Sequence, residues 1–176
     1  SIVATGSSIL NHKWTFGDGT ELLSTNYQTN KTYNAAGTYL SKLVVTTNNG
    51  CKDSTTRNLV VNPKPTANFT NTTVCLNQTS QFNTTSNIST GSISSYFWNF
   101  DDNTTSSLNN PTKTYQFAGA YNVMHVVVSD SSCRDTVIKP VLVWPLISGN
   151  TISASQVICQ GNIPASLQSS ATLVGG

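Results

Sequence analysis

Charged residues are scarce in this chain of 176 residues. They make up 9% of the sequence, and the net charge is only +2, whereas roughly 25% of the residues of a typical soluble domain are charged. The few lysines and arginines are scattered and form no basic stripe of the kind that binds phosphates. No apolar run approaches the roughly 18 residues that cross a bilayer. The sequence therefore predicts neither a nucleic-acid partner nor a membrane span.

Groups suited to catalysis are also few. The carboxylates are Asp18, Glu21, Asp53, Asp101, Asp102, Asp130 and Asp135, and the histidines are His12 and His125. Asp101 and Asp102 are adjacent, so on an extended backbone they point apart and cannot flank a glycosidic bond. The sequence contains no nucleophile elbow, zinc-binding helix motif or phosphate loop. We therefore expect no enzymatic activity, no catalytic residue and no cofactor in this segment.

What the chain does contain is a long internal repeat. The segments Trp14–Gly19 and Lys31–Tyr39 return as Trp98–Asn103 and Lys113–Tyr121. Tyr33 and Tyr115 are 82 residues apart, as are Cys51 and Cys133, whereas the two tryptophans are 84 apart. A repeat of this length is a small domain, because each copy has its own aromatic and β-branched residues with which to close a core.

Short β-branched and aromatic runs alternate with Ser, Thr and Asn, and helical periodicity is absent, which predicts an all-β sandwich. In the second copy we expect strands over Thr66–Thr70, Ser80–Asn83, Ile93–Phe100, Thr112–Tyr115, Tyr121–Ser129 and Thr136–Val143. Tyr96, Trp98 and Phe100 share one parity and should point inward. The expected core residues of the two copies are Trp14, Phe16, Tyr33, Tyr39, Trp98, Phe100, Tyr115 and Tyr121.

The Gly17–Gly19 segment and its counterpart Asp101–Asn103 follow a strand directly and are typical of turns, since Gly and Asn tolerate a positive φ and Asp can bond nearby amides. Calcium bound by Asp18, Asp101 and Asp102 is the weaker alternative, because such a site needs about six oxygens. His125 shares the parity of the inward residues of its strand. We interpret it as a core-edge imidazole, because no metal-binding or catalytic partner accompanies it.

The repeated Trp-x-Phe-Gly-Asp-Gly and Lys-Thr-Tyr-x-x-Ala-Gly-x-Tyr patterns, with Asn49–Ser54 after them, resemble the polycystic kidney disease (PKD) domain over residues 1–145. The resemblance implies tandem immunoglobulin-like β-sandwiches, arranged end to end, that serve as spacers or binding modules in extracellular proteins. The Pro-containing linkers and serial Cys-containing modules look like the surface adhesins of gliding bacteria with type IX secretion.

The cysteines agree with the modules expected from the repeat. We predict domain 1 over residues 1–62, with its N-terminal strand missing, domain 2 over 63–145, and the start of a third, incomplete β module over 146–176. Cys75 begins domain 2 and Cys133 precedes its last strand, a placement suited to an intradomain disulfide. Cys159 lies in a segment similar to that around Cys75. Disulfides form in extracytoplasmic compartments, so the expected disulfide favours such a location. The cysteines lack the spacing that a cysteine-based metal site requires.

Two functions remain open. The first is a stiff spacer and contact surface for protein or glycan in a long extracellular or cell-surface filament, whose partners are its neighbouring modules and an unidentified surface protein or polysaccharide. The alternative is an accessory carbohydrate- or protein-binding module of a larger secreted hydrolase. Asp53-Ser54-Thr55 and Asp135-Thr136-Val137 recur at equivalent places and resemble a bacterial O-glycan acceptor, so we expect O-glycosylation at Ser54 and Thr136. The prolines at positions 63 and 65 should stiffen the junction.

Overall fold

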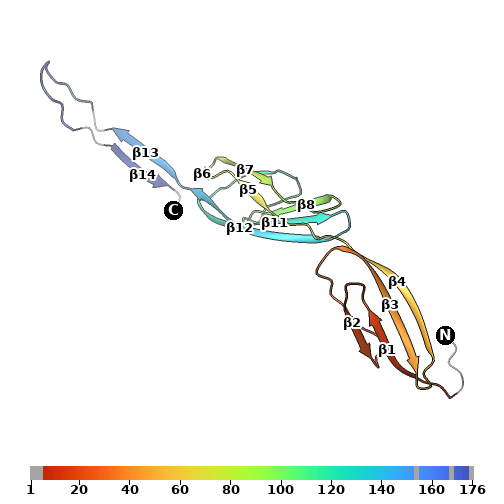
Figure 1. Ribbon diagram of the computed structural model, residues 1–176. Coiled ribbons are helices and arrows are strands. Elements are labelled where there is room, and N and C mark those ends of the chain that lie inside the picture. The colour runs from red at the N-terminus through yellow and green to blue at the C-terminus, as the bar shows by residue number, and fades with distance from the viewer. Residues whose placement is uncertain (1–5, 153–154, 167–168, 175–176) are drawn as a thin grey trace. The chain divides into compact units, whose positions relative to one another are not determined.

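The computed structural model describes residues 6–152, 155–166 and 169–174, and these residues form strands, turns and loops without a helix. The chain divides into two compact units, residues 1–64 and 65–176 (Figure 1). The predicted all-β class is confirmed.

Unit 1 contains a single four-stranded antiparallel sheet in the described part of the chain. Its strands are β1 (Ile9–Thr15), β2 (Glu21–Ser24), β3 (Gly37–Thr47) and β4 (Lys52–Val61), in the order β2-β1-β3-β4. The long pair β3 and β4 forms a hairpin in which Tyr39 lies opposite Leu59 and Leu43 opposite Thr55. Figure 1 shows these strands in red to yellow-orange. The described residues of unit 1 form no second sheet.

The described residues of unit 2 form two sheets that enclose its core and a separate two-stranded hairpin. The first consists of β5 (Phe69–Asn71), β7 (Thr79–Thr84) and β10 (Thr112–Thr114), in the order β10-β7-β5. The second contains β6 (Val74–Cys75), β8 (Ile93–Asn99), β9 (Thr105–Ser106), β11 (Gly119–Ser129) and β12 (Arg134–Trp144), in the order β6-β12-β11-β8-β9. A further hairpin pairs β13 (Leu146–Ile152) with β14 (Ser169–Val174). The expected strands of the second copy are all present, and the short strands β6 and β9 were not predicted.

The core of unit 2 lies between its two sheets. It consists of Phe69, Phe82, Trp98, Phe100, Tyr115, Val123, Val141 and Val143, with Tyr121 and Val137 packed against it. Trp98 is completely buried, whereas Phe97, its neighbour of opposite parity, is 41% exposed. The inward orientation predicted from strand parity is thus observed. Unit 1 has fewer fully buried side chains: Phe16 is buried, but Trp14, Tyr33 and Tyr39 are only half-buried.

The predicted Cys75–Cys133 disulfide is wrong. All four cysteines are free, and the strand pairing explains why these two cannot meet. Cys75 pairs with Trp144 at the end of β12, whereas Cys133 immediately precedes the start of that strand. An 11-residue strand spans about 36 Å at about 3.3 Å per residue, and a disulfide needs Cα atoms within about 7 Å.

Candidate functional site: a repeated clasp and an open sheet face

Each unit contains the same polar clasp at the turn after its tryptophan strand. In unit 1, Asp18 Oδ1 accepts hydrogen bonds from the Thr20 amide (3.0 Å) and the Thr20 hydroxyl (2.6 Å). The Lys31 ammonium lies 2.8 Å from Asp18 Oδ2 and 5.5 Å from the centre of the Phe16 ring. Lys31 thus binds a carboxylate and an aromatic face together, which fixes the turn against the loop that follows β2.

Unit 2 repeats this clasp with equivalent residues. Asp102 Oδ1 accepts bonds from the amide and hydroxyl of Thr104, at 3.2 and 2.6 Å. Lys113 pairs with the other carboxylate oxygen and lies 5.7 Å from the centre of the Phe100 ring and 5.5 Å from that of Tyr115. Because the two lysines sit at the same place in the Lys-Thr-Tyr motif, the repetition itself was a signal for this clasp that sequence reasoning missed.

The motif tyrosines close the same region by bonding to main-chain carbonyls. Tyr33 Oη donates to Phe16 O at 2.9 Å, and Tyr39 Oη donates to Ala35 O at 2.9 Å. In unit 2, Tyr115 and Tyr121 make the equivalent bonds to Phe100 O and Phe117 O at 3.4 and 2.8 Å, and their rings stack at 4.0 Å. The two tyrosines of the Tyr-x₅-Tyr pattern therefore stabilise the fold in both copies.

The electrostatics of the clasp favour ionised carboxylates. The bonds from Lys31 and Thr20 hold the pKa of Asp18 well below its usual range. Burial opposes ionisation of Asp102, but the bonds from Lys113 and Thr104 outweigh it and lower the pKa. The three calcium candidates all have partners within the protein. Asp18 and Asp102 contact lysine ammonium groups, and Asp101 Oδ2 accepts a hydrogen bond from the Asn122 amide at 2.8 Å. The residues described include no group of three or more metal-ligating side chains.

The turn backbone shows how the second copy accommodates a residue other than glycine at the first motif glycine position. Gly17 has φ 78°, and a Cβ there would lie 2.8 Å from the Leu40 amide nitrogen. Asp101 occupies the equivalent position with φ 64°, and its carboxylate bonds the amide of Asn122, the counterpart of Leu40. The side chain of Asp101 thus makes a hydrogen bond that offsets the cost of the left-handed backbone, which is about 1–2 kcal/mol for a residue with a Cβ.

His125 is fully buried in the core of unit 2. Its ring stacks on Trp98 with centroids 3.8 Å apart, and its Nε2 lies 3.0 Å from Thr84 Oγ1 and 3.3 Å from Ser86 Oγ. Burial lowers its pKa from the ordinary 6.5 to about 4. The predicted core position is therefore observed, deeper than the expected core edge, and the hydroxyl partners come from β7 and the residues just after it.

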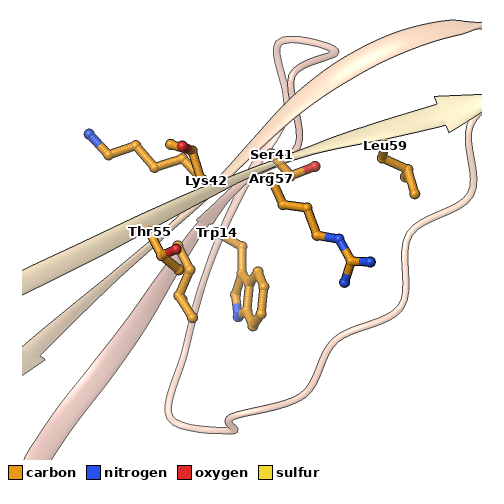
Figure 2. A pocket seen from close by; sticks show the side chains of 8 residues that line it. Trp14, Ser41, Lys42, Thr55, Arg57 and Leu59 are labelled. Atoms are coloured by element: carbon orange, nitrogen blue, oxygen red, sulfur yellow. The ribbon is translucent and has the colours of Figure 1, made fainter. Parts of the chain in front are cut away.

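A hollow lies beside Trp14 on the sheet of unit 1. Trp14, Leu43, Arg57 and Leu59 line this shallow hollow of about 300 Å³, and Leu59 is 42% exposed. Figure 2 shows Trp14 and Arg57 on one side of the strands and Lys42 projecting to the other. Trp98 Nε1 donates to Leu108 O at 2.9 Å, but the equivalent Trp14 Nε1 is buried with no hydrogen-bond partner among the described residues.

The remaining candidate residues lie apart from these sites. Ser54 on β4 and Thr136 on β12 are exposed. Trp144 is 52% exposed and lines an apolar hollow with Cys75, Pro145 and Ile147. The described part of the chain contains no helix that is long and apolar enough to cross a membrane.

The chain belongs to the PKD domain family, whose model matches residues 2–61 and 62–142. The PKD1 domain of Vibrio anguillarum Epp is 30% identical, with a TM-score of 0.45, and covers 47% of this chain and 96% of its own. The PKD1 domain of the Vibrio cholerae metalloprotease PrtV is 32% identical, with a TM-score of 0.42, and covers 47% and 98%.

Fibronectin(III)-like modules of Clostridium thermocellum CbhA are 17% identical, with a TM-score of 0.40, and cover 81% of this chain and 82% of their own. No curated protein matches the chain. PKD domains are non-catalytic modules, typically of extracellular surface proteins or secreted enzymes, and this chain contains two of them in tandem.

Proposed function

We propose that this chain is a spacer segment of a long bacterial cell-surface filament or adhesin of the type IX-secreted kind, and that it takes no part in catalysis. The observation that carries the proposal is the duplication of a whole module together with its clasp. Asp18–Lys31 and Asp102–Lys113 fix the same turn in both copies, which suits a series of structurally equivalent units. In this proposal residues 1–62 and 63–145 are the modules, and residues 146–176 begin a third.

A spacer also needs a stiff junction, and the composition of residues 62–65 supports one. Unit 1 ends its last strand at Val61, and Pro65 is already fully buried in unit 2. Only residues 62–64 lie between these two points, and Pro63 further restricts φ and removes a backbone donor. The modules in this proposal lie end to end and hold a binding surface away from the cell.

The native gene product tests this role. We expect antiserum raised against the chain to detect a very large polypeptide that external protease removes from intact cells. This result follows from a filament built of many modules. A small secreted product that contains one hydrolase domain would contradict the filament and favour the accessory-module alternative. The measurement is an immunoblot of cell and medium fractions, before and after protease treatment.

We further propose that Ser54 and Thr136 carry O-linked glycans. Both residues are exposed on strands, and each follows an aspartate at an equivalent position of its module. We expect mass spectrometry of the protein from its native host to show hexose-type additions on the peptides that contain these two residues. Unmodified peptides at both sites would remove the proposal. The Ser54→Ala and Thr136→Ala variants should each lose one of the additions.

A further inference from the structure

The five-stranded sheet of unit 2 has an outer face that points away from the core. Trp98 and His125 lie opposite each other on β8 and β11, and both are fully buried on the inner face. Because side chains alternate along a strand, the residues next to them point outward. The outward apolar residues of β8, β11 and β12 are Phe97, Met124, Val126, Val128, Ile138 and Leu142, and we call them the outer patch.

The outer patch is contiguous across the three strands. Val126 lies opposite Phe97 on β8 and opposite Thr136 on β12, and Met124 lies opposite Ile138. Val126 is only 4% exposed although it points outward, whereas Phe97 is 41% and Ile138 60% exposed. An apolar layer therefore surrounds Val126 on the outside of the sheet. Contiguous apolar patches on a soluble protein mark interaction sites.

The equivalent face of unit 1 shows that the fold does not require this layer. Lys13 pairs with Val44 on β3 and occupies the place of Phe97. Thr56 on β4 occupies the place of Ile138. Lys42 projects from the same face of unit 1 (Figure 2). Ammonium groups and a hydroxyl thus replace apolar side chains in the other copy of the module, so the outer patch serves a purpose other than closing the sandwich.

The charges on the outer face indicate what can cover it. Among the outward residues of β8, β11 and β12, Arg134 is the one charged side chain, and none is acidic. A highly charged partner face would lose its hydration there without gaining an opposite charge. The partner face must therefore be flat, apolar and almost uncharged. The outer patch of a second copy meets each of these requirements.

We propose that two copies of the chain pair through the outer patches of their second units, with the two β12 strands antiparallel. Sheets pack face to face about 10 Å apart with their strands nearly aligned. The antiparallel orientation places Arg134 of each copy near Trp144 of the other, whose indole is 52% exposed, and a cation is attracted to such a ring. It also keeps the two guanidinium groups apart. The contact is isologous and closes as a dimer.

The size of the face sets the strength of the association. Strands lie about 4.8 Å apart and rise about 3.3 Å per residue, so β8, β11 and β12 together cover roughly 450 Å². A pair of copies then buries about 900 Å², which is at the low end for specific contacts between proteins. We therefore expect a weak dimer with a dissociation constant of about 0.1–1 mM.

Sedimentation equilibrium of the full chain measures this association. Thr136 lies on the same face, so the chain is expressed in a host that adds no O-glycans. Reducing buffer keeps the four free cysteines from cross-linking the copies. We expect the mass to rise from that of the monomer toward that of the dimer as the concentration increases through the range of the dissociation constant.

Ile138→Lys tests whether the outer patch forms the contact. The substitution should weaken association about tenfold or more, because the contact buries an ammonium group without a partner. The matched control is Thr56→Lys, the exposed position on β4 that corresponds to Ile138, which should leave association unchanged. Amide NMR spectra verify that both variants remain folded.

A mixing experiment tests the two-fold symmetry of the contact. Ile138 lies near the middle of β12 (Arg134–Trp144), so the two copies of this side chain approach each other across the symmetry axis. Ile138→Lys and Ile138→Glu should each prevent self-association through like-charge repulsion. An equimolar mixture of the two variants should associate again, because opposite charges then meet at the axis.

Three outcomes would overturn the proposal. One is a monomer mass at every concentration up to about 1 mM, the weak limit expected for this contact area, which would leave the outer patch to a different protein. Another is association that Ile138→Lys and Thr56→Lys weaken to the same extent. The third is a mixture of the lysine and glutamate variants that stays monomeric. None of these results bears on whether the chain is a cell-surface spacer.

Discussion

Trp98→Ala is expected to destabilise unit 2 by about 4 kcal/mol, in the range for deleting a buried tryptophan. Trp98 has no exposed surface and contacts Phe69, Phe82 and His125. Its Nε1 also donates to Leu108 O, so the substitution leaves that carbonyl without its partner. Because domains of this size are stable by only about 5–15 kcal/mol, the variant should unfold unit 2 at much lower urea concentration.

The matched control is Trp14→Ala in unit 1. Trp14 lies at the equivalent sequence position but is half-buried, and its Nε1 has no partner among the described residues. We expect the free energy of unfolding of unit 1 to fall by only about 1–2 kcal/mol, because folding removes less apolar surface of Trp14 from water than of Trp98. The measurement is a urea titration at concentrations where the chain is monomeric. Amide NMR signals of each unit monitor the titration, so the unfolding of unit 1 and that of unit 2 are measured separately. Equal losses in both units would contradict the difference in burial between Trp98 and Trp14.

Acid is expected to destabilise unit 2 through His125. The pKa of this imidazole is lowered to about 4 in the fold, against 6.5 when exposed. Above pH 6.5 the ring is neutral in both states, so stability does not depend on its titration. Below pH 6.5 the unfolded chain takes up a proton that the folded chain does not, and the free energy of unfolding falls until about pH 4. The total loss should be about 2–3 kcal/mol.

Unit 1 indicates the control substitution for this titration. Leu43 occupies the position equivalent to His125, so His125→Leu places a residue that the same strand position accepts in the other module. The variant should lose the pH dependence between 6.5 and 4. The carboxylate of Asp102, whose pKa is lowered, acts only below its ordinary value of 3.8, outside that window. Urea titrations of unit 2 at pH 7 and pH 4.5 measure the effect, and an unchanged slope in the leucine variant would assign the acid sensitivity to another group.

The strands and the core of unit 2 were predictable because alternation along a half-buried strand reports which side chains face inward. Trp98 and Phe97 show this clearly, with 0% and 41% of their surface exposed. The same argument failed for Trp14, since the identity of a motif residue does not reveal whether a second sheet covers it. Burial depends on a segment that pairs from elsewhere in the chain.

The clasp and the cysteines show where sequence reasoning reached its limit. Asp102 and Lys113 are eleven residues apart in the sequence, and only the path of the intervening loop brings them together. For Cys75 and Cys133, the prediction placed the first strand next to the last hairpin. Strand β6 instead runs parallel to the far end of β12, a pairing that no local pattern indicates.

The proposed spacer function requires that the modules keep one orientation, and in this proposal residues 62–65 supply the stiffness. The direct test is a distance distribution between spin labels introduced by Leu40→Cys and Asn122→Cys, at equivalent positions of the two modules, in a chain whose four native cysteines are replaced by serine and which is diluted with unlabelled chain. We predict a single narrow distribution that broadens when a Gly-Ser-Gly-Ser segment is inserted after Asn62. A broad distribution in the parent chain, unchanged by the insertion, would contradict the spacer function.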